Sequence, residues 1–403
     1  MQSLKSEFPI FETARKEGRP LIFLDNASTT QKPQCVINAV TGFYAGYYAN
    51  VGRGLYWPAT AASFNYDQAR EKVRAFIGAS SKKEVIFTSG TTDAVNKVVN
   101  SFLLPQLKNG DEVLVSEMEH HSNFVPWQQA CESKGAQLKV IPLDAGLNLD
   151  LSKFAAMLTD KVKILAITAI SNTLGVKNDL KSIINLAHQH NIKVFVDAAQ
   201  LPLSEKIDVQ EMDCDFLAFS GHKVFGPTGI GVLYGKQVLL QKMSPLAYGG
   251  GMVQQVSVDK TMMADLPFKH EAGTPNIAGT IGLAAAIDFI NSVGVEEIGR
   301  HGAELRKYAV KRLSEIEGLT LFAKDAKSTA ILSFTMEGIH PHDIAAFLAE
   351  KGIAVRAGHH CTHPLMQKLD IAGTVRVSFN IYNSEEEVDL LKNTLVEIRS
   401  FFL

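Results

Sequence analysis

Two residues that could act on a single ligand stand at the ends of two apolar runs. Val194-Phe195-Val196 ends in Asp197, and a second run leads to Lys223, twenty-six residues after Asp197. Two neighbouring strands of one sheet would deliver this acid and this amine to the same edge. Pyridoxal 5′-phosphate (PLP) needs such a pair, because an amine bonds its aldehyde carbon and a carboxylate keeps its pyridine nitrogen protonated.

A candidate phosphate site lies earlier in the chain. The run Val85-Ile86-Phe87 is followed by Thr88-Ser89-Gly90-Thr91-Thr92-Asp93 and then by a helical pattern. A strand, a Gly/Thr turn and a helix N-terminus expose backbone N–H groups and hydroxyls, such as that of Thr92, to an anion. A helix cap without a ligand explains the same pattern equally well.

Other polar residues follow the same two runs. Ser220 and His222 directly precede Lys223 and could donate hydrogen bonds to the phosphate, while Gln200, one helical turn after Asp197, could reach the phenolic oxygen. His120, which follows another apolar run, could stack on the pyridine ring. The alternative for His120 and its neighbour His121 is a purely structural capping role.

Cys361 is a candidate nucleophile. It lies just beyond Ile353-Ala354-Val355, on a Gly-containing loop flanked by Arg356, His359, His360 and His363. Positive neighbours favour the thiolate form of cysteine, and a mobile loop could carry it to a substrate. One alternative is a small buried apolar side chain. A metal site is the other, although adjacent side chains seldom converge on one ion.

Arg376 is a candidate carboxylate clamp. In Val375-Arg376-Val377-Ser378-Phe379 the apolar side chains alternate with polar ones, so Arg376 faces away from the apolar side of the strand. A guanidinium there could bind a carboxylate through two hydrogen bonds. A surface arginine on an edge strand is the alternative.

The order of runs predicts an α/β fold with two domains. Apolar runs alternate with helical stretches such as Leu180–His190, which favours a largely parallel sheet covered by helices on both faces. The runs are Leu21–Leu24, Val85–Thr88, Glu112–Ser116, Gln137–Pro142, Ile164–Thr168, Lys193–Asp197, Phe216–Ser220 and Gly231–Tyr234. We expect a large domain over residues 21–290, and a smaller α+β domain from residues 1–20 and 291–403 that carries the cysteine loop.

Composition excludes several classes of protein. Lys and Arg total 40 and Asp and Glu total 42, so a formal charge of −2 gives no basis for binding nucleic acid or an anionic membrane. No stretch has the length of a membrane span, and the N-terminus lacks a signal-peptide pattern. The four cysteines are far apart, which favours a reducing compartment, and we expect the cytoplasm.

Together these stretches resemble the cysteine desulfurases and selenocysteine lyases of the class V aminotransferase family. The resembling stretches are LDNASTT (24–30), FTSGTTDAVN (87–96), EMEHHSNFVPW (117–127), ISNTLG (170–175), VDAAQ (196–200), FSGHKVFGPTGIGVLYG (219–235), EAGTPN (271–276) and RAGHHC (356–361). The resemblance implies fold type I of the PLP-dependent transferases, and the group with a short cysteine loop.

The resemblance also implies roles for individual residues. Cys361 would take the sulfur of L-cysteine as a persulfide with release of L-alanine, and selenocysteine would follow the same route. The implied catalytic residues are Cys361, Lys223 and His120; the implied cofactor-binding residues are Lys223, Asp197, Gln200, His120, Thr92, Ser220, His222, Asn172 and Thr274; the implied substrate-binding residues are Arg376, Arg356 and Asn172. No metal is implied.

The resemblance further implies partners. It implies a homodimer, in which Thr274 contacts the cofactor phosphate of the other subunit. A small sulfur-carrier protein would accept the persulfide for iron–sulfur cluster or other sulfur-cofactor synthesis.

The sequence departs from the family near the substrate entrance. Gly52 and Tyr56 flank the Arg53-Gly54 pair where the family commonly carries histidines, which puts one or two substrate contacts in doubt. Two other functions stay open. Another class V PLP enzyme, a transaminase or a kynureninase-like hydrolase, would make no catalytic use of Cys361. A non-enzymatic, metal-binding sulfur-trafficking protein would bind no PLP.

Overall fold

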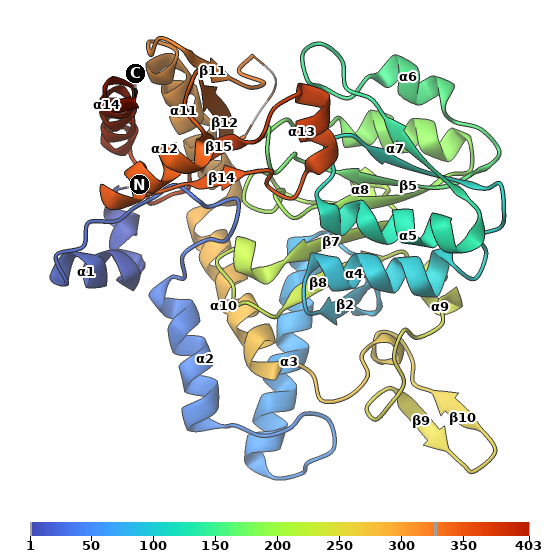
Figure 1. Ribbon diagram of the computed structural model, residues 1–403. Coiled ribbons are helices and arrows are strands. Elements are labelled where there is room, and N and C mark those ends of the chain that lie inside the picture. Colours follow the sequence, from blue (N-terminus) through green and yellow to red (C-terminus); the bar gives the residue numbers. More distant parts are fainter. Residues whose placement is uncertain (1, 326, 328, 403) are drawn as a thin grey trace.

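A seven-stranded sheet organises the larger part of the chain (Figure 1). The computed structural model describes residues 2–325, 327 and 329–402. The strands lie in the order β2 (Val85–Thr88), β8 (Gly231–Gly235), β7 (Phe216–Ser220), β6 (Lys193–Asp197), β5 (Val162–Thr168), β3 (Glu112–Ser116) and β4 (Gln137–Ile141). Only β8 is antiparallel to its neighbours, so the expected largely parallel sheet is confirmed.

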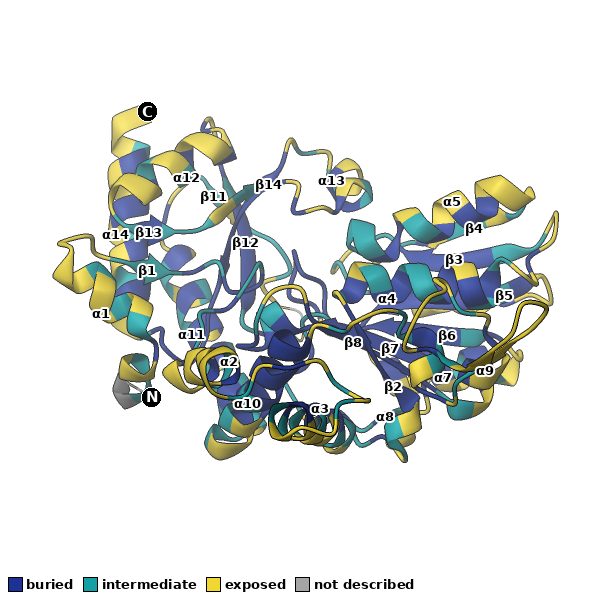
Figure 2. Cartoon of the chain, turned by 90° about the horizontal axis from the view of Figure 1, so that it is seen from below, coloured by how far each residue is buried: buried dark blue, intermediate teal, exposed yellow. Residues whose placement is uncertain are grey.

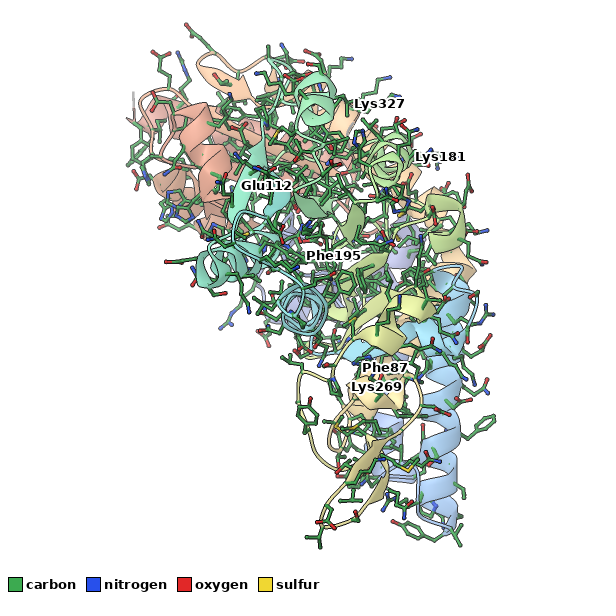
Figure 3. The ribbon with its side chains drawn as sticks, turned by 90° about the vertical axis from the view of Figure 1, so that its right-hand side faces the viewer. Phe87, Glu112, Lys181, Phe195, Lys269 and Lys327 are labelled. Carbon is green, nitrogen blue, oxygen red and sulfur yellow. The ribbon has the colours of Figure 1, made fainter. Side chains whose placement is uncertain are left out.

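Helices cover both faces of this sheet. Successive side chains of β6 alternate between two buried clusters: Val194 and Val196 pack on one face and Phe195, labelled in Figure 3, on the other. The first face carries α3 (Trp57–Phe76), α7 (Leu180–Gln189) and α10 (Ile277–Val293). The second carries α4 (Thr91–Val98), α5 (Val125–Lys134) and α9 (Gln237–Lys242). Because both faces of the sheet are covered by apolar residues, the sequences of its strands are nearly continuous apolar runs.

A second sheet forms the smaller part of the molecule. Its strands are β11 (Leu319–Leu321), β12 (Ile331–Met336), β15 (Thr374–Ser378) and β14 (Arg356–Gly358), all antiparallel. The helices α11 (Val295–Leu313), α12 (Pro341–Glu350) and α14 (Glu385–Phe402) supply side chains to the same buried cluster as β12 and β15. This is the α+β arrangement expected for the C-terminal third.

One apolar run belongs to a different sheet from the one we expected. Leu21–Leu24 was assigned to the large parallel sheet, but β1 (Ile22–Phe23) pairs with β13 (Ile353–Ala354), and Leu24 is buried in the cluster of the smaller part. Its pairing partner is more than three hundred residues away, so no local pattern indicated it. The N-terminal residues also reach this part, because Lys5 forms an ion pair with Glu387 of α14.

The chain passes from the larger to the smaller part at Gly294. Helices α10 and α11 meet there at an angle of 75°. We propose this glycine as the boundary, close to the expected residue 290, with β1 assigned to the smaller part. Figure 2 shows buried residues along α10 and the large sheet, and exposed ones on the outer surfaces of α1 and α5. Within the described residues no single helix is long and apolar enough to cross a membrane; only α10 and α11 taken together pass that test.

The remaining elements are short or peripheral. They are η1 (Gln2–Glu7), α1 (Pro9–Lys16), α2 (Gln34–Gly46), η2 (Lys82–Glu84), the π-helix η3 (Val99–Leu103), η4 (His121–Asn123), α6 (Leu151–Ala156), α8 (Val209–Met212), η5 (Gly221–Lys223), β9 (Val253–Val256), β10 (Thr261–Met263), η6 (Phe268–His270) and α13 (His363–Leu369). Two of them, η4 and η5, follow strands of the large sheet at the edge where the polar motifs gather.

Gly231 of β8 is a position where only hydrogen fits. It pairs with Thr88 on one side and with Ser220 on the other, and a Cβ there would lie 2.5 Å from the Cα of Gly90. We expect Gly231→Ala to lower the free energy of unfolding by about 1–3 kcal/mol, because the turn before α4 must move. Denaturant unfolding measures this.

Gly249→Ala is the matched control for that variant, because its Cβ would meet no heavy atom within 4 Å. Equal stability of the two variants would contradict the tight packing inferred at Gly231.

Candidate active site

Asp197 and Lys223 meet at the carboxyl ends of adjacent strands. Asp197 ends β6, and β7 leads directly into η5, which ends at Lys223. Both side chains line a cavity of about 220 Å³. Burial lowers the pKa of Lys223 to about 8; the Asp197 carboxylate opposes this shift, and Arg376 adds to it. Burial raises the pKa of Asp197, whereas the hydrogen bond from the Ala199 N–H and the charge of Lys223 lower it. The acid and the amine are therefore delivered to one site, as the spacing predicted.

The expected phosphate cup lies at the same cavity. The helix α4 begins at Thr91, whose N–H donates to the hydroxyl of Ser220 (2.9 Å), and the Thr92 hydroxyl lies 2.7 Å from that of Ser122. Thr92, Ser220 and His222 all line the cavity. Burial and the charge of Lys223 lower the pKa of His222 to about 4, so at neutral pH its ring is uncharged. Hydroxyls and helix N–H groups thus converge where a phosphate would need donors.

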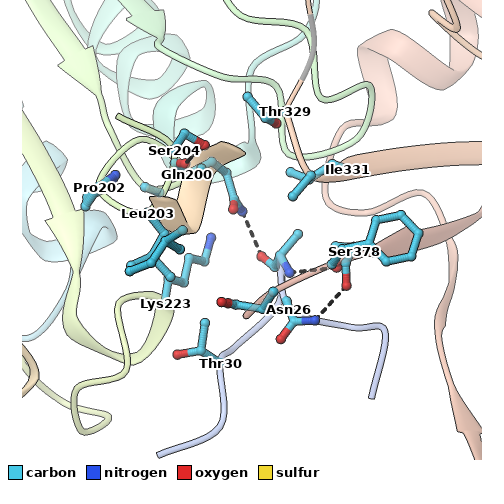
Figure 4. Close-up of a pocket in the computed structure, with 17 residues that line it drawn as sticks. Asn26, Thr30, Gln200, Pro202, Leu203, Ser204, Lys223, Thr329, Ile331 and Ser378 are labelled. Carbon is cyan, nitrogen blue, oxygen red and sulfur yellow. Dashed lines mark hydrogen bonds between the residues drawn. The ribbon is translucent and has the colours of Figure 1, made fainter. Parts of the chain in front are cut away.

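Gln200 and His120 are also present at the cavity. The Gln200 amide donates to the carbonyl of Ala27 (2.7 Å), which fixes its position beside Lys223 (Figure 4). The His120 Nδ1 accepts the N–H of Ser122 (3.1 Å), so Nδ1 carries no proton. Burial and Lys223 lower the pKa of His120 to about 3, which leaves a flat, neutral ring.

Arg376 is buried at the centre of the smaller sheet. Its strand β15 lies between β12 and β14, so the alternative of a surface arginine on an edge strand is wrong. Its guanidinium donates to the carbonyl of Asn172 (2.9 Å) and to Asp25 (3.0 Å). The buried Nε has no hydrogen-bond partner among the described residues.

Arg356 lies beside Arg376, as its register partner in β14, and pairs with the same Asp25 carboxylate (3.2 Å). Two guanidiniums therefore share one carboxylate at the cavity wall. This excess of positive charge suits the binding of a second carboxylate.

Cys361 also lines this cavity, from the turn between β14 and α13 of the smaller part. It is exposed, and both Cys361 and His360 adopt left-handed backbone conformations, with φ of 57° and 52°. Contacts with the larger part hold this turn. The N–H of His121 donates to the carbonyl of Cys361 (2.8 Å), Asn172 donates to that of His360 (2.9 Å), and the Thr173 and Thr362 hydroxyls lie 3.0 Å apart. The turn is therefore anchored more firmly than a mobile loop would be.

The histidines around Cys361 face different partners. The buried His360 ring hydrogen-bonds Thr374 (2.8 Å), whereas His359 and His363 are exposed. Among the described residues, no group of three or more His, Cys, Asp and Glu side chains has a geometry that could hold a metal ion.

Comparisons with known proteins place these features in a family. The family model described as aminotransferase class-V matches residues 22–391. The chain belongs to the class V aminotransferase family. This confirms the resemblance that the motifs indicated, with PLP as the cofactor. The donor set fits PLP: Lys223 for the aldehyde, Asp197 for the pyridine nitrogen, and the α4 N-terminus with Ser220 for the phosphate.

Within this family the chain is similar to cysteine desulfurases. It is 47% identical over 399 residues to a probable cysteine desulfurase of Halalkalibacterium halodurans, covering 99% of this chain and 98% of the relative. A solved cysteine desulfurase of Escherichia coli, in an S-sulfonic acid form, is 38% identical with a TM-score of 0.92, covering 100% of this chain and 98% of that one. Another, from Thermococcus onnurineus, is 37% identical with a TM-score of 0.93, covering 99% and 98%.

Three positions of interest in this class V enzyme lie away from the Lys223 cavity. Thr274 and Gly52 line a separate cavity of about 700 Å³, and the Asn50 amide donates to Thr274 (3.4 Å). Tyr56 is exposed at the start of α3. Within one chain, none of the three lines the cavity that holds Lys223 and Cys361.

The structure also brings in residues that we did not single out. Asp25 joins the two arginines, and Lys32 donates to the carbonyl of His222 (2.9 Å), next to Lys223. Glu119 is fully buried and accepts hydrogen bonds from Ser116, Asn123 and Thr168. Asp25 belongs to the LDNASTT motif and Glu119 to the EMEHHSNFVPW motif. The sequence of a motif, however, does not show which residue an acidic side chain contacts.

The charge of Asp197 should set the titration of Lys223. Asp197 stabilises the ammonium form and so raises the pKa of Lys223; Asp197→Asn removes that charge and should lower the pKa further. In cofactor-free protein, the rate at which Lys223 bonds added PLP should rise with pH to a midpoint near 8 in the wild type and at lower pH in the variant. Stopped-flow absorbance across pH measures both midpoints.

Asp259→Asn, a change at an exposed loop residue, is the control and should leave the midpoint in place. A midpoint that stays or rises in Asp197→Asn would show that Asp197 does not act on Lys223.

Proposed function

We propose that this enzyme, a cysteine desulfurase by its relatives, takes the sulfur of L-cysteine as a persulfide on Cys361 and releases L-alanine. One observation carries the proposal: Lys223 comes from the large sheet, Cys361 and Arg376 come from the smaller part, and all three line one cavity. A transaminase on this fold needs the lysine and the arginine but has no use for an exposed thiol there.

The residues of the cavity divide into those that hold the cofactor and those that hold the substrate. Asp197 would hold the pyridine nitrogen, and the α4 N-terminus with Thr92, Ser220 and His222 would hold the phosphate. When bound, PLP supplies an electron sink at the α-carbon of the substrate. The neutral ring of His120 would stack on the cofactor, and Gln200 would donate to its phenolic oxygen.

The arginine pair anchors the substrate. Arg376 and Arg356 share the single negative charge of Asp25, so one positive charge remains for the carboxylate of L-cysteine. Asn172 is held between both sides of the site, because its carbonyl accepts from Arg376 and its amide donates to His360.

Lys223 and Cys361 perform the proton and sulfur steps. Lys223, whose pKa is about 8, accepts and returns a proton at the substrate α-carbon. The Cys361 thiolate attacks the substrate sulfur. The new S–S bond forms as the carbon–sulfur bond breaks, and the carbon gains that electron pair and a proton. L-cysteine and the Cys361 thiol thus give L-alanine and a Cys361 persulfide, without an external oxidant.

The exposed position of Cys361 supports transfer of the persulfide to a second protein. A small sulfur-carrier protein with its own thiol can approach an exposed cysteine but not a buried one. The free state of all four cysteines, two exposed and two buried, supports a reducing compartment, and we infer the cytoplasm.

A homodimer is supported by an apolar surface on α2, α3 and their connection. Its exposed side chains include Tyr44, Tyr48, Leu55, Tyr56 and Trp57, with Leu55 95% exposed. The cavity that contains Thr274 lies partly on α3, through Tyr66 and Arg70. This arrangement supports the expectation that Thr274 serves the phosphate site of the other subunit.

Cys361→Ala tests the nucleophile. The variant should keep bound PLP and its absorbance, because no cofactor contact is lost, but should lose persulfide formation from L-cysteine by at least about a thousandfold. Mass spectrometry of the tryptic peptide that contains Cys361 should find one added sulfur in the wild type. Cys35→Ala is the control, because Cys35 is also an exposed free thiol but lies outside the cavity. Full turnover by Cys361→Ala would rule out the assignment.

Leu55→Asp tests the dimer. A charge at the most exposed of these apolar side chains should shift the protein toward monomer in sedimentation velocity, since buried unpaired charge weakens an interface. Val258→Asp, at an equally exposed residue on the β9–β10 hairpin, is the comparison. A wild-type protein that sediments as a monomer would contradict the dimer.

A further inference from the structure

His121 joins the large sheet to the cysteine turn by two hydrogen bonds. Its backbone N–H donates to the carbonyl of Cys361 (2.8 Å), and its ring Nε2 accepts the backbone N–H of His363 (3.2 Å). His121 is the donor in the first bond and the acceptor in the second, and together the two bonds span the turn from Cys361 to His363. His121 therefore holds the backbone at Cys361 itself and two residues beyond it.

The ring contact specifies the protonation state of His121. Because Nε2 accepts a backbone N–H, it must keep its lone pair, and the proton of the neutral ring lies on Nδ1. The His363 ring stacks on it, with centroids 4.9 Å apart and planes at 19°, and its Nδ1 lies 3.0 Å from the same Nε2. His359 stacks in turn on His363, with centroids 4.3 Å apart.

We propose that the neutral His121 ring is a latch that holds the turn at Cys361 in the conformation that presents the thiol to the Lys223 cavity, and that protonation of this ring releases it. The inference rests on the proposed function of Cys361 as the sulfur acceptor. His121 is a positioning residue, since it acts through the backbone of the turn rather than on the substrate.

The left-handed backbone of the turn explains why a latch is needed. A non-glycine residue with φ near +55° lies about 1 kcal/mol or more above its favoured conformations, and here His360 and Cys361 are consecutive. Contacts outside the turn must hold that conformation. Asn172 holds His360 and Thr173 holds Thr362, while His121 bonds both Cys361 and His363.

The charges around His121 set the direction of its pH dependence. Its facing groups are His363 and His359 from the turn and His120 from its own segment, and the α4 residues of the groove it borders, Thr92 and Asn96, are uncharged. Burial, then His363 and His359, lower the pKa of His121 below its ordinary value. The latch is therefore complete above about pH 6.5 and is lost as the pH falls through the lowered pKa.

The experiment compares His121→Ala with His121→Gln in the PLP-loaded enzyme. Glutamine can place an oxygen acceptor near the position of Nε2 but does not titrate, whereas alanine offers no acceptor. Persulfide formation on Cys361 is followed by single-turnover mass spectrometry from pH 5.5 to 8.5. Hydrogen exchange of the peptide 359–366 is measured at pH 8.

We expect His121→Ala to form persulfide about tenfold to a hundredfold more slowly at pH 8 with an unchanged PLP spectrum, because the thiol is misplaced. Its peptide 359–366 should exchange faster. His121→Gln should keep the wild-type rate and protection at pH 8. As the pH falls below 6.5, its rate should fall less steeply than that of the wild type, because both share the titration of Lys223 but glutamine does not titrate.

His359→Gln is the matched control, because it removes an imidazole of the same stack that does not bond His121. It should keep the wild-type rate and protection at pH 8. Wild-type rate and exchange in His121→Ala would overturn the latch, and so would an unchanged acid limb in His121→Gln. If His121→Ala fails to fold, the comparison of His121→Gln with the wild type across pH still tests the latch. Failure of the proposed function is distinct, because the wild type itself would then carry no added sulfur on Cys361.

Discussion

The site depends on one short crossing segment, Asp25–Lys32, that ties the smaller sheet to the turn that carries Lys223. At its start Asp25 binds the two arginines of the smaller sheet, and the N–H of Ala27 donates to the hydroxyl of Ser378. At its end the Thr30 N–H and Lys32 donate to the carbonyl of His222. The same few residues therefore connect the arginine pair of the smaller sheet to the turn that carries Lys223.

The electrostatics of the site follow from the way segment 25–32 joins the two sheets. Lys223, Arg356 and Arg376 bring positive charge together, and Asp25 and Asp197 offset only part of it. Burial, and to a smaller extent Lys223 and Arg376, lower the pKa of the ring of His120, which therefore stays neutral at the pH where the lysine titrates. A site with surplus positive charge and neutral imidazoles favours ligands that carry a phosphate or a carboxylate, and PLP and an amino acid carry both.

Much of this could be predicted from the sequence, because it is local. Strands such as β6 and β7 are buried on both faces and read as apolar runs, and Asp197 and Lys223 follow them directly. Arg376, His120 and Cys361 were recognised from their motifs. The pairing of β1 with β13 could not be foreseen, because each strand has only two residues and no period can be read from it. Nor could the partners of Asp25 and His121, since sequence shows that a charge or an imidazole is present but not what faces it.

The pairing of β1 with β13 has a consequence for biosynthesis. Residues 22–23 emerge from the ribosome early, yet their hydrogen-bonding partner at residues 353–354 is made more than three hundred residues later. The arginine pair and the cysteine turn are translated later still. The part of the site that contains Lys223 can therefore fold before the part that contains Cys361 has been synthesised. A contact of such long sequence separation forms late in folding. A growing chain can therefore gain a cofactor pocket before it gains the nucleophile, and the reactive thiol becomes productive only once both halves of the molecule have joined.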